Sequence, residues 1–307
     1  MALAVESSWD GRYDDRLVAL PDGRWASATD RALTRWDVDG PGDPVVVDEP
    51  RRGPLVWLPA VDQLAWGPAL ADGSGPEPSS LATAALPELA ASAIRHYRVA
   101  LGTFEPLGRK VVLALEHQPS RSTAAGSRTG PRTRLAVVDR VRGECTSMLG
   151  DDLGEPGCVA AGAGCVLVGL PGRVMVLPGG DPGTEVRLPG VAAARALAVD
   201  SAGIDPTGVA AAAFGDGTVA TWALGATSVS PRPAHDGAVL ALTWAPGGRA
   251  LATAGADGMV RCWTTGGKPS AETDLGDAVT AVAWLADGRL VAKVGSSAGR
   301  IVVLAAP

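Results

Sequence analysis

Lysine, histidine and the smaller aromatic residues are scarce in this chain of 307 residues. Three residues are Lys, three are His, two are Tyr and two are Phe, whereas nine are Trp. Three histidines scattered along the sequence do not supply the clustered ligands that a metal site requires, so no metal ion is expected.

Cysteine is also rare, and no long apolar run is present. The four cysteines form no CxxC pair, and their spacing suits neither a zinc site nor a dense disulfide framework, so buried thiols in a reducing cytosol are expected. No run of 18 or more apolar residues occurs, which excludes a membrane-spanning helix. Residues 1–8 have no basic residue and contain Glu6, so no signal peptide is predicted and a cytoplasmic location is expected.

The overall composition narrows the class of protein further. A hydrophobic content of 46% excludes a disordered chain. Gly and Pro, at 40 and 24 residues, argue against a mostly helical protein because both break helices. The net charge of −6 argues against binding of nucleic acid or an acidic membrane by the whole surface.

The clearest structural pattern is a run of three short segments near the C-terminus. Residues 239–244 alternate as a strand does, and residues 250–254 form a second strand after a Pro-Gly-Gly turn. Asp257-Gly258 is a tight hairpin signal that leads into a third strand over residues 259–263. The pattern therefore predicts three consecutive antiparallel strands.

The end of this pattern recurs along the chain. Trp36, Trp222 and Trp263 each follow an Asp by six residues. Weaker copies place an aliphatic residue at the same point: Val138, Leu177, Leu304 and, in the second copy, Leu86. The spacing from the third copy onward is about 40 residues, which is typical of a propeller blade with three clear strands and a weaker outer one. Counting along the chain gives seven copies.

These repeats resemble the WD-repeat β-propeller family over nearly the whole chain, most clearly in the sixth copy. In that family a His, a Ser or Thr, an Asp and a Trp form a hydrogen-bonded set, and His235, Thr253, Asp257 and Trp263 match the four positions. Copies one and five keep the Asp and the Trp but lack the His. The set is interpreted as structural, because it satisfies buried polar groups internally. A composition rich in Arg, Ala, Gly, Val and Pro indicates a GC-rich, actinobacterium-like bacterial source.

The resemblance implies an all-β fold, a single seven-bladed β-propeller of four-stranded antiparallel blades over residues 1–307. The last copy leaves almost no chain for a fourth strand, so an N-terminal strand at about residues 2–7 is expected to close the ring and remove exposed edges. Loop insertions rich in Gly, Pro and Ser are predicted at residues 69–80 and 119–132. An alternative register makes residues 94–99 the third strand of the second copy, and we disfavour it because no room remains for an outer strand.

No convincing phosphate-binding loop occurs in the sequence. The glycines at 162 and 164 lack the helix whose N-terminus would hold a phosphate. The innermost strands are nearly free of ionisable groups, so no catalytic cluster is expected on the axis. Neither an enzyme activity nor a cofactor is predicted.

Arginines and two aromatic residues are the candidate partner-binding residues. Residues 119–134 contain four arginines and no acid, and loops of this kind are expected to share one face with the loop that contains Arg51 and Arg52. Arg suits bidentate recognition of an acidic peptide or a phosphate, although a loop kept soluble by its charge gives the same pattern. Trp9 and Tyr13 are expected in an exposed loop after the closing strand. The candidates are Arg51, Arg52, Arg121, Arg128, Arg132, Trp9 and Tyr13.

The function implied by the resemblance is that of a non-catalytic scaffold or adaptor, which presents a loop-built face to a protein or peptide partner. Two alternatives stay open: a regulatory or immunity-type subunit that binds one effector protein, and a propeller enzyme or small-ligand binder that uses the axial pocket. Nucleic acid is a weaker candidate partner, because no aromatic residues for base stacking lie among the arginines. The sequence does not fix the oligomeric state, and a monomer is favoured.

Overall fold

The computed structural model consists of strands and the turns that connect them. It describes residues 2–11, 16–20, 23–29, 31–37, 39–46, 55–58, 63–66, 69–72, 97–104, 110–117, 133–139, 142, 144–150, 153–154, 156–162, 164–181, 183–188, 194–199, 208–295 and 299–305. Every regular element in these ranges is a β-strand. Within these ranges, no helix has the length and apolar character needed to cross a membrane.

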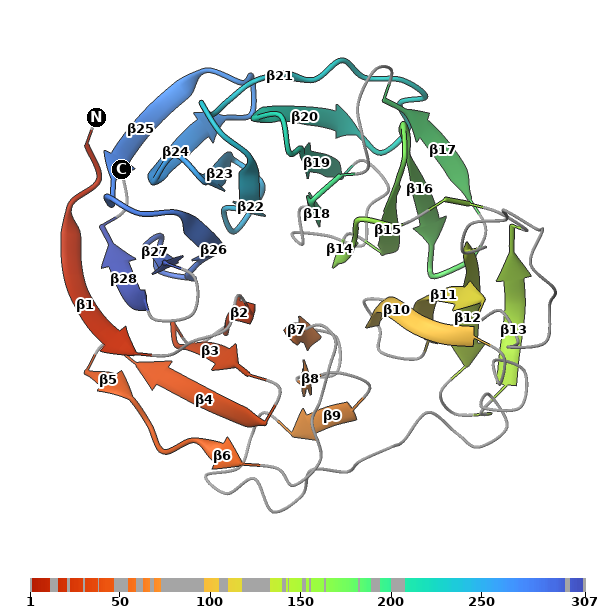
Figure 1. Cartoon of the computed structure of the whole chain (residues 1–307), viewed down its shortest axis with the longest axis horizontal. Helices are drawn as coiled ribbons and strands as arrows, with labels where there is room; N and C mark the ends of the chain where they lie inside the picture. The colour runs from red at the N-terminus through yellow and green to blue at the C-terminus, as the bar shows by residue number, and fades with distance from the viewer. Residues whose placement is uncertain are drawn as a thin grey trace, which may run out of the picture.

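The described strands form seven antiparallel sheets arranged around a common centre (Figure 1). The first sheet contains β2 (Arg16–Ala19), β3 (Trp25–Ala28), β4 (Ala32–Asp37), β5 (Gly40–Pro41) and β6 (Val45–Val46), and both β5 and β6 pair with β4. The second contains β7 (Leu55–Leu58), β8 (Gln63–Trp66) and β9 (Ala69–Asp72). The third contains β10 (Tyr97–Phe104), β11 (Lys110–His117), β12 (Thr133–Asp139) and β13 (Glu144–Leu149).

The remaining four sheets have four strands each. The fourth contains β14 (Cys158–Gly162), β15 (Cys165–Leu170), β16 (Arg173–Pro178) and β17 (Thr184–Arg187). The fifth contains β18 (Ala196–Val199), β19 (Val209–Ala213), β20 (Thr218–Ala223) and β21 (Arg232–Pro233). The sixth contains β22 (Val239–Trp244), β23 (Ala250–Gly255), β24 (Met259–Thr264) and β25 (Pro269–Asp274). The last contains β26 (Val279–Trp284), β27 (Leu290–Val294), β28 (Gly299–Leu304) and β1 (Val5–Gly11).

This all-β architecture of four-stranded antiparallel sheets fits a β-propeller, as the sequence predicted. In the sixth sheet β22, β23 and β24 coincide with the three predicted strands to within one residue. The tight turns there contain Gly247 and Gly258 at positive φ, a backbone conformation that side chains with a Cβ rarely adopt. Local turn chemistry and strand alternation therefore agree with the tertiary fold in this part of the chain.

The second sheet departs from the sequence prediction. Its third strand is β9, so the loop predicted over residues 69–80 is wrong for residues 69–72, and the third strand does not end at Leu86. β8 ends at Trp66, β9 begins at Ala69, and these two residues pair. The connection between the two strands is therefore shorter than the repeat spacing of the other copies predicts. Residues 73–80 and the second predicted insertion, 119–132, lie outside the described residues.

The alternative register for the second copy is also wrong. Tyr97 opens β10, which is the innermost strand of the third sheet and pairs with β11 along its whole length. Residues 97–99 therefore belong to the third sheet and do not form the third strand of the second.

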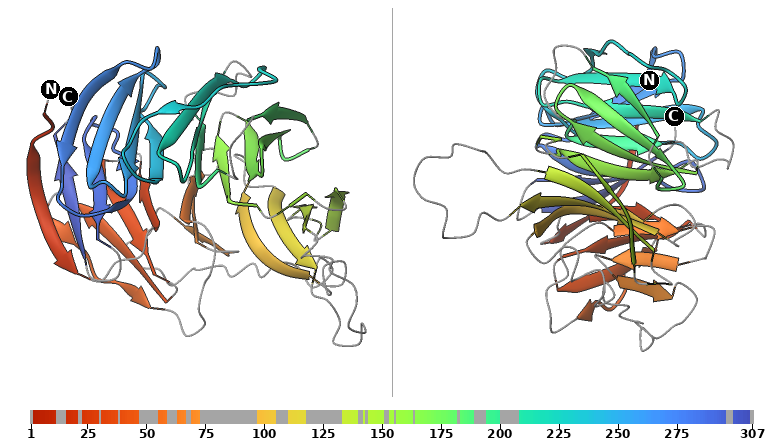
Figure 2. Two further views of the ribbon diagram at one scale, coloured as in Figure 1. Left: turned by 45° about the horizontal axis from the view of Figure 1, so that its top comes forward. Right: turned by 90° about the vertical axis from the view of Figure 1, so that its right-hand side faces the viewer.

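The N-terminal strand begins and ends later than predicted. β1 runs from Val5 to Gly11 and pairs with β28 as far as Gly299, whereas residues 2–7 were expected. The two chain ends lie close together in both views (Figures 1 and 2). The preceding residues contact the sixth sheet, because Ala2 forms a parallel bridge with Glu272 of β25.

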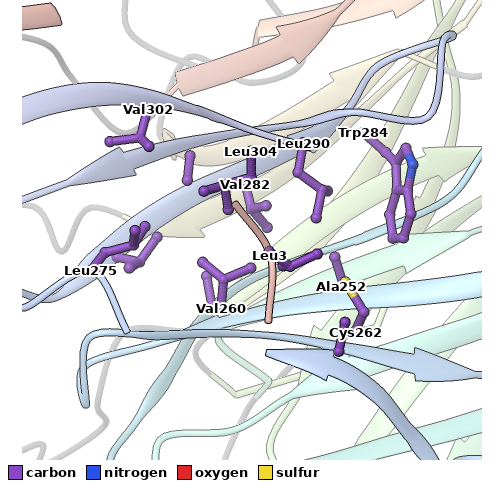
Figure 3. Close-up of a cluster of buried hydrophobic side chains, with 14 of the residues drawn as sticks. Leu3, Ala252, Val260, Cys262, Leu275, Val282, Trp284, Leu290, Val302 and Leu304 are labelled. Atoms are coloured by element: carbon purple, nitrogen blue, oxygen red, sulfur yellow. The ribbon is translucent and has the colours of Figure 1, made fainter. Parts of the chain in front are cut away.

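Leu3 anchors this N-terminal segment in the core. Its side chain is 4% exposed and belongs to a cluster shared by the sixth and last sheets (Figure 3). Its backbone N–H donates to the Glu272 carbonyl over 3.2 Å. The segment therefore joins two sheets that are neighbours around the ring, and burial of Leu3 contributes to stability because it removes apolar surface from water.

Candidate interaction face

The four residues matched in the sixth copy meet within one sheet. His235 precedes β22, Thr253 lies on β23, Asp257 lies in the following turn and Trp263 lies on β24. The Nε1–H of Trp263 donates to Thr253 Oγ1 over 2.8 Å. Thr253 Oγ1 lies 2.8 Å from His235 Nε2, and His235 Nδ1 lies 2.8 Å from Asp257 Oδ1. The antiparallel register thus joins the four side chains into one chain of polar contacts.

The direction of these hydrogen bonds follows from what each group can donate. An ionised Asp257 only accepts hydrogen bonds, so we assign the imidazole proton to His235 Nδ1. Nε2 then accepts from the Thr253 hydroxyl, and the same hydroxyl oxygen accepts from the Trp263 indole. Every side-chain polar atom of these four residues therefore has a partner, which is the condition for burying such groups at low cost.

Arg261 holds the acidic end of this set in its charged form. Its Nη1 donates to Asp257 Oδ2 over 2.7 Å, and its Nε donates to Glu272 Oε2 over 3.2 Å. Burial opposes ionisation of Asp257, but hydrogen bonds from Arg261 and His235 outweigh it and lower its pKa to about 2. The pKa of His235 is lowered, because burial and the nearby charge of Arg261 together outweigh the hydrogen bond and charge of the Asp257 carboxylate. A neutral imidazole beside a carboxylate is therefore the state at neutral pH.

The geometry of the set is suited to support and not to chemistry on a substrate. The side chains of His235 and Thr253 are both fully buried. Gly255 makes room for His235 and Asp257, because a Cβ at that position would collide with His235 Nδ1 and Asp257 Oδ1. The set therefore fixes the β23–β24 turn and the chain entering β22.

Equivalent positions in other sheets are only partly filled. In the first sheet Trp36 Nε1 donates to Ser27 Oγ over 2.9 Å, and the strand register places Ser27 where Thr253 lies in the sixth. The sequence analysis missed Ser27, although it precedes Trp36 by nearly the same interval that separates Thr253 from Trp263. In the fifth sheet the corresponding residue is Ala212, and the buried Trp222 Nε1 has no hydrogen-bond partner among the residues that the structure describes.

One end of the sheets carries the His235 loop and the Asp257 turn, and we term it the His235 end. The β19–β20 turn of the fifth sheet reaches it, because the Gly217 carbonyl accepts from the His235 backbone N–H over 3.0 Å. Acidic side chains predominate here over the fifth to last sheets: Asp216, Asp236, Asp257, Asp274 and Asp277. At the same end of the fourth sheet, and just before the fifth, arginines outnumber the one described acid, Glu185: they are Arg173, Arg187 and Arg195. The charge on this end is therefore divided between two sectors.

Most of the predicted partner-binding residues lie outside the described residues. These are Arg51, Arg52, Arg121, Arg128, Arg132 and Tyr13. The structure describes the strand ends on either side of two of these segments. They are His117 and Thr133 for one segment, and Val46 and Leu55 for the other. The partner-binding role of these six residues stays a prediction.

Trp9 is placed differently from the prediction. It lies within β1 opposite Ile301, because β28 offers a strand partner as far as Gly299, and so it is not in a loop. Its ring is half-buried and lies 6.1 Å from that of Trp25 and 5.8 Å from that of Trp36, centroid to centroid. Trp9 therefore packs at the junction of the last and first sheets and is not a freely exposed aromatic contact.

The cysteines and possible metal ligands add no reactive group. All four cysteines are thiols, and burial raises the pKa of Cys158 to about 12 and of Cys165 and Cys262 to about 11. Such thiols are poor nucleophiles at neutral pH, because the thiolate is the reactive form. Among the described residues, no group of three or more His, Cys, Asp and Glu side chains is arranged to hold a metal ion.

Comparison with known proteins supports the WD-repeat assignment at the sixth sheet. The family model for the WD domain, G-beta repeat, matches residues 227–264, a span that includes the whole hydrogen-bonded set. No curated protein matches the chain. WD40 repeats commonly mediate protein–protein interaction, and proteins built from them are generally non-catalytic scaffolds.

Proposed function

We propose that this protein is a non-catalytic interaction scaffold or adaptor whose seven sheets form a single closed ring over residues 1–307. The WD40 match at residues 227–264 carries the proposal, because its central hydrogen-bonded set is intact and such repeats commonly mediate protein–protein interaction. Pairing of β1 with β28 and the circular arrangement of the sheets support closure by the N-terminal strand (Figure 1).

The surface that we propose for the partner is the His235 end. Loops held by rigid strands position side chains for binding without a large ordering cost. The division of charge described above supports a partner that is acidic where it meets the arginine sector, which extends the predicted role of Arg51, Arg52, Arg121, Arg128 and Arg132. Four cysteine thiols, none in a disulfide, support a reducing cytosol as the location.

The test is affinity capture from cytosol of the source organism followed by reconstitution with the purified partner. We expect one or a few stoichiometric proteins, and weaker binding when the five predicted arginines are replaced by Ser. A variant with Arg142 and Arg249 replaced by Ser is the control, because both are exposed and lie at the opposite end of their sheets. Loss of binding in the control alone, or no enriched protein under several growth conditions, would refute the proposal.

A further inference from the structure

Two arginines face each other at the His235 end of the fourth sheet. Arg173 opens β16, Arg187 ends β17, and the antiparallel register pairs them directly. Directly paired residues project from the same face of a sheet with Cβ atoms about 5 Å apart, and like charges in this position destabilise it. A negative charge placed between the two would therefore stabilise the pairing.

Within the described residues, Glu185 supplies only part of that charge. Arg173 Nη1 lies 3.7 Å from Glu185 Oε2, which is an ion-pair distance and too long for a hydrogen bond. Both side chains are partly exposed, so solvent screens the attraction. Among the described residues, no acceptor lies within hydrogen-bond distance of the buried Arg173 Nε–H. Arg187 is exposed and has no side-chain hydrogen bond or ion pair within the part of the chain that the structure describes.

The face that carries this pair is turned toward the third sheet. Met175, next on the same face of β16, packs against the cluster shared by the third and fourth sheets. Val174 and Val186 point the other way and pack toward the fifth sheet. Arg195, which is exposed and precedes β18, lies at the same end of the neighbouring sheet. An extended ligand that crosses from the third to the fifth sheet at this end would meet these arginines in succession.

We propose that Arg173 and Arg187 form a binding site for an oxyanion on an acidic peptide, either a carboxylate or a phosphorylated side chain. Guanidinium groups bind such oxygens in a bidentate manner, and an oxyanion between the two would accept from the exposed N–H groups of both side chains and cancel the repulsion. Glu185 competes for the same donors and lowers the affinity. The site deepens the proposed function, since it names the chemistry of the partner on the interaction face.

Peptide binding tests the site directly. The probes are two fluorescent peptides of equal length, one rich in Glu and one carrying phosphoserine, measured by anisotropy against the full chain. We expect Arg173→Gln and Arg187→Gln each to weaken binding about tenfold, the effect of about 1.4 kcal/mol from one charge-assisted contact. We expect Glu185→Gln to strengthen it. The peptide that binds more tightly identifies the oxyanion.

Two variants control for overall charge. Arg249→Gln and Glu144→Gln make the same charge changes at exposed positions at the opposite end of the sheets, and each should change the affinity less than about twofold, because screening weakens distant charges. Equal losses in Arg249→Gln and Arg187→Gln would show non-specific attraction and overturn the site. Binding of a single-stranded oligonucleotide but of neither peptide, lost in Arg187→Gln, would assign the arginines to nucleic acid and also overturn it.

A second readout does not depend on the choice of peptide. Inorganic phosphate should raise the unfolding temperature of the wild-type chain and have no effect on the Arg173→Gln, Arg187→Gln double variant. Without phosphate, Arg187→Gln should unfold at a slightly higher temperature than wild type because the repulsion is gone. If neither change in unfolding temperature is seen and neither peptide binds, the proposed site is overturned. If the captured partner still binds the double variant, the scaffold function stands and only this site is rejected.

Discussion

The hydroxyl of Thr253 gives the sharpest test of how the sixth sheet is held. It accepts the Trp263 indole N–H over 2.8 Å and lies 2.8 Å from His235 Nε2, and the residue is fully buried. Thr253→Val keeps the volume and removes this oxygen. Two polar groups are then left without a partner in a site that water does not reach.

The expected magnitude follows from that count. Each buried polar group left unsatisfied costs about 1–3 kcal/mol, so Thr253→Val, which leaves two such groups, should lower the free energy of unfolding by about 2–6 kcal/mol. Thr253→Ser keeps the hydroxyl and removes one methyl group, so it should cost only about 1 kcal/mol. Thr253→Val is therefore expected to lower the free energy of unfolding more than Thr253→Ser, although Val is the larger residue.

Urea unfolding followed by tryptophan fluorescence and circular dichroism measures both variants. A double-mutant cycle with Trp263→Phe isolates the indole contact, because Thr253→Val should cost about 1 kcal/mol less when the indole N–H is already absent. The reasoning fails if Ser is as destabilising as Val. It also fails if the cost of Val is the same in both backgrounds.

Three further predictions concern other parts of the ring. Ala212→Ser should raise the free energy of unfolding by about 1 kcal/mol in urea titrations, because it offers an acceptor to the buried indole of Trp222. Stability should fall on acidification, since the pKa of His235 is lowered from 6.5 and that of Asp257 from 3.8 to about 2, so the folded chain binds fewer protons than the unfolded one. This loss begins below pH 6.5 with His235 and continues between pH 3.8 and about 2 with Asp257, as unfolding at a series of pH values would measure. Leu3→Ala should cost about 2–4 kcal/mol and lower the thermal midpoint, because its side chain is 4% exposed.

Each of these has a matched control. Ala211→Ser adds the same hydroxyl on the opposite, equally buried face and should destabilise, and a gain there would contradict the explanation for Ala212. Asp257→Asn should remove the component below pH 3.8, and an unchanged pH profile would refute its assignment. Val5→Ala changes a residue that is 54% exposed and should have little effect, so an effect as large as that of Leu3→Ala would count against the core contact.

The sequence identified the features that short-range chemistry controls. Alternation over residues 239–244, the Asp257-Gly258 turn and the interval from Asp to Trp each lie within one hairpin, where a few residues decide the backbone conformation. The all-β class and the sixth sheet followed from these patterns. The second sheet differs from the prediction because pairing with β8 continues to residue 72, within the Gly- and Pro-rich stretch 69–80 for which the composition predicts a loop.

Only the tertiary structure decided how separate segments meet. Trp9 packs on Trp25 and Trp36 because β28 carries β1 across the junction of the last and first sheets, and no local signal marks a contact between chain ends so far apart in sequence. The repulsive pairing of Arg173 with Arg187 depends on the register of two strands. A hairpin is encoded within a few neighbouring residues, whereas register and contacts between sheets are set by packing of the whole ring.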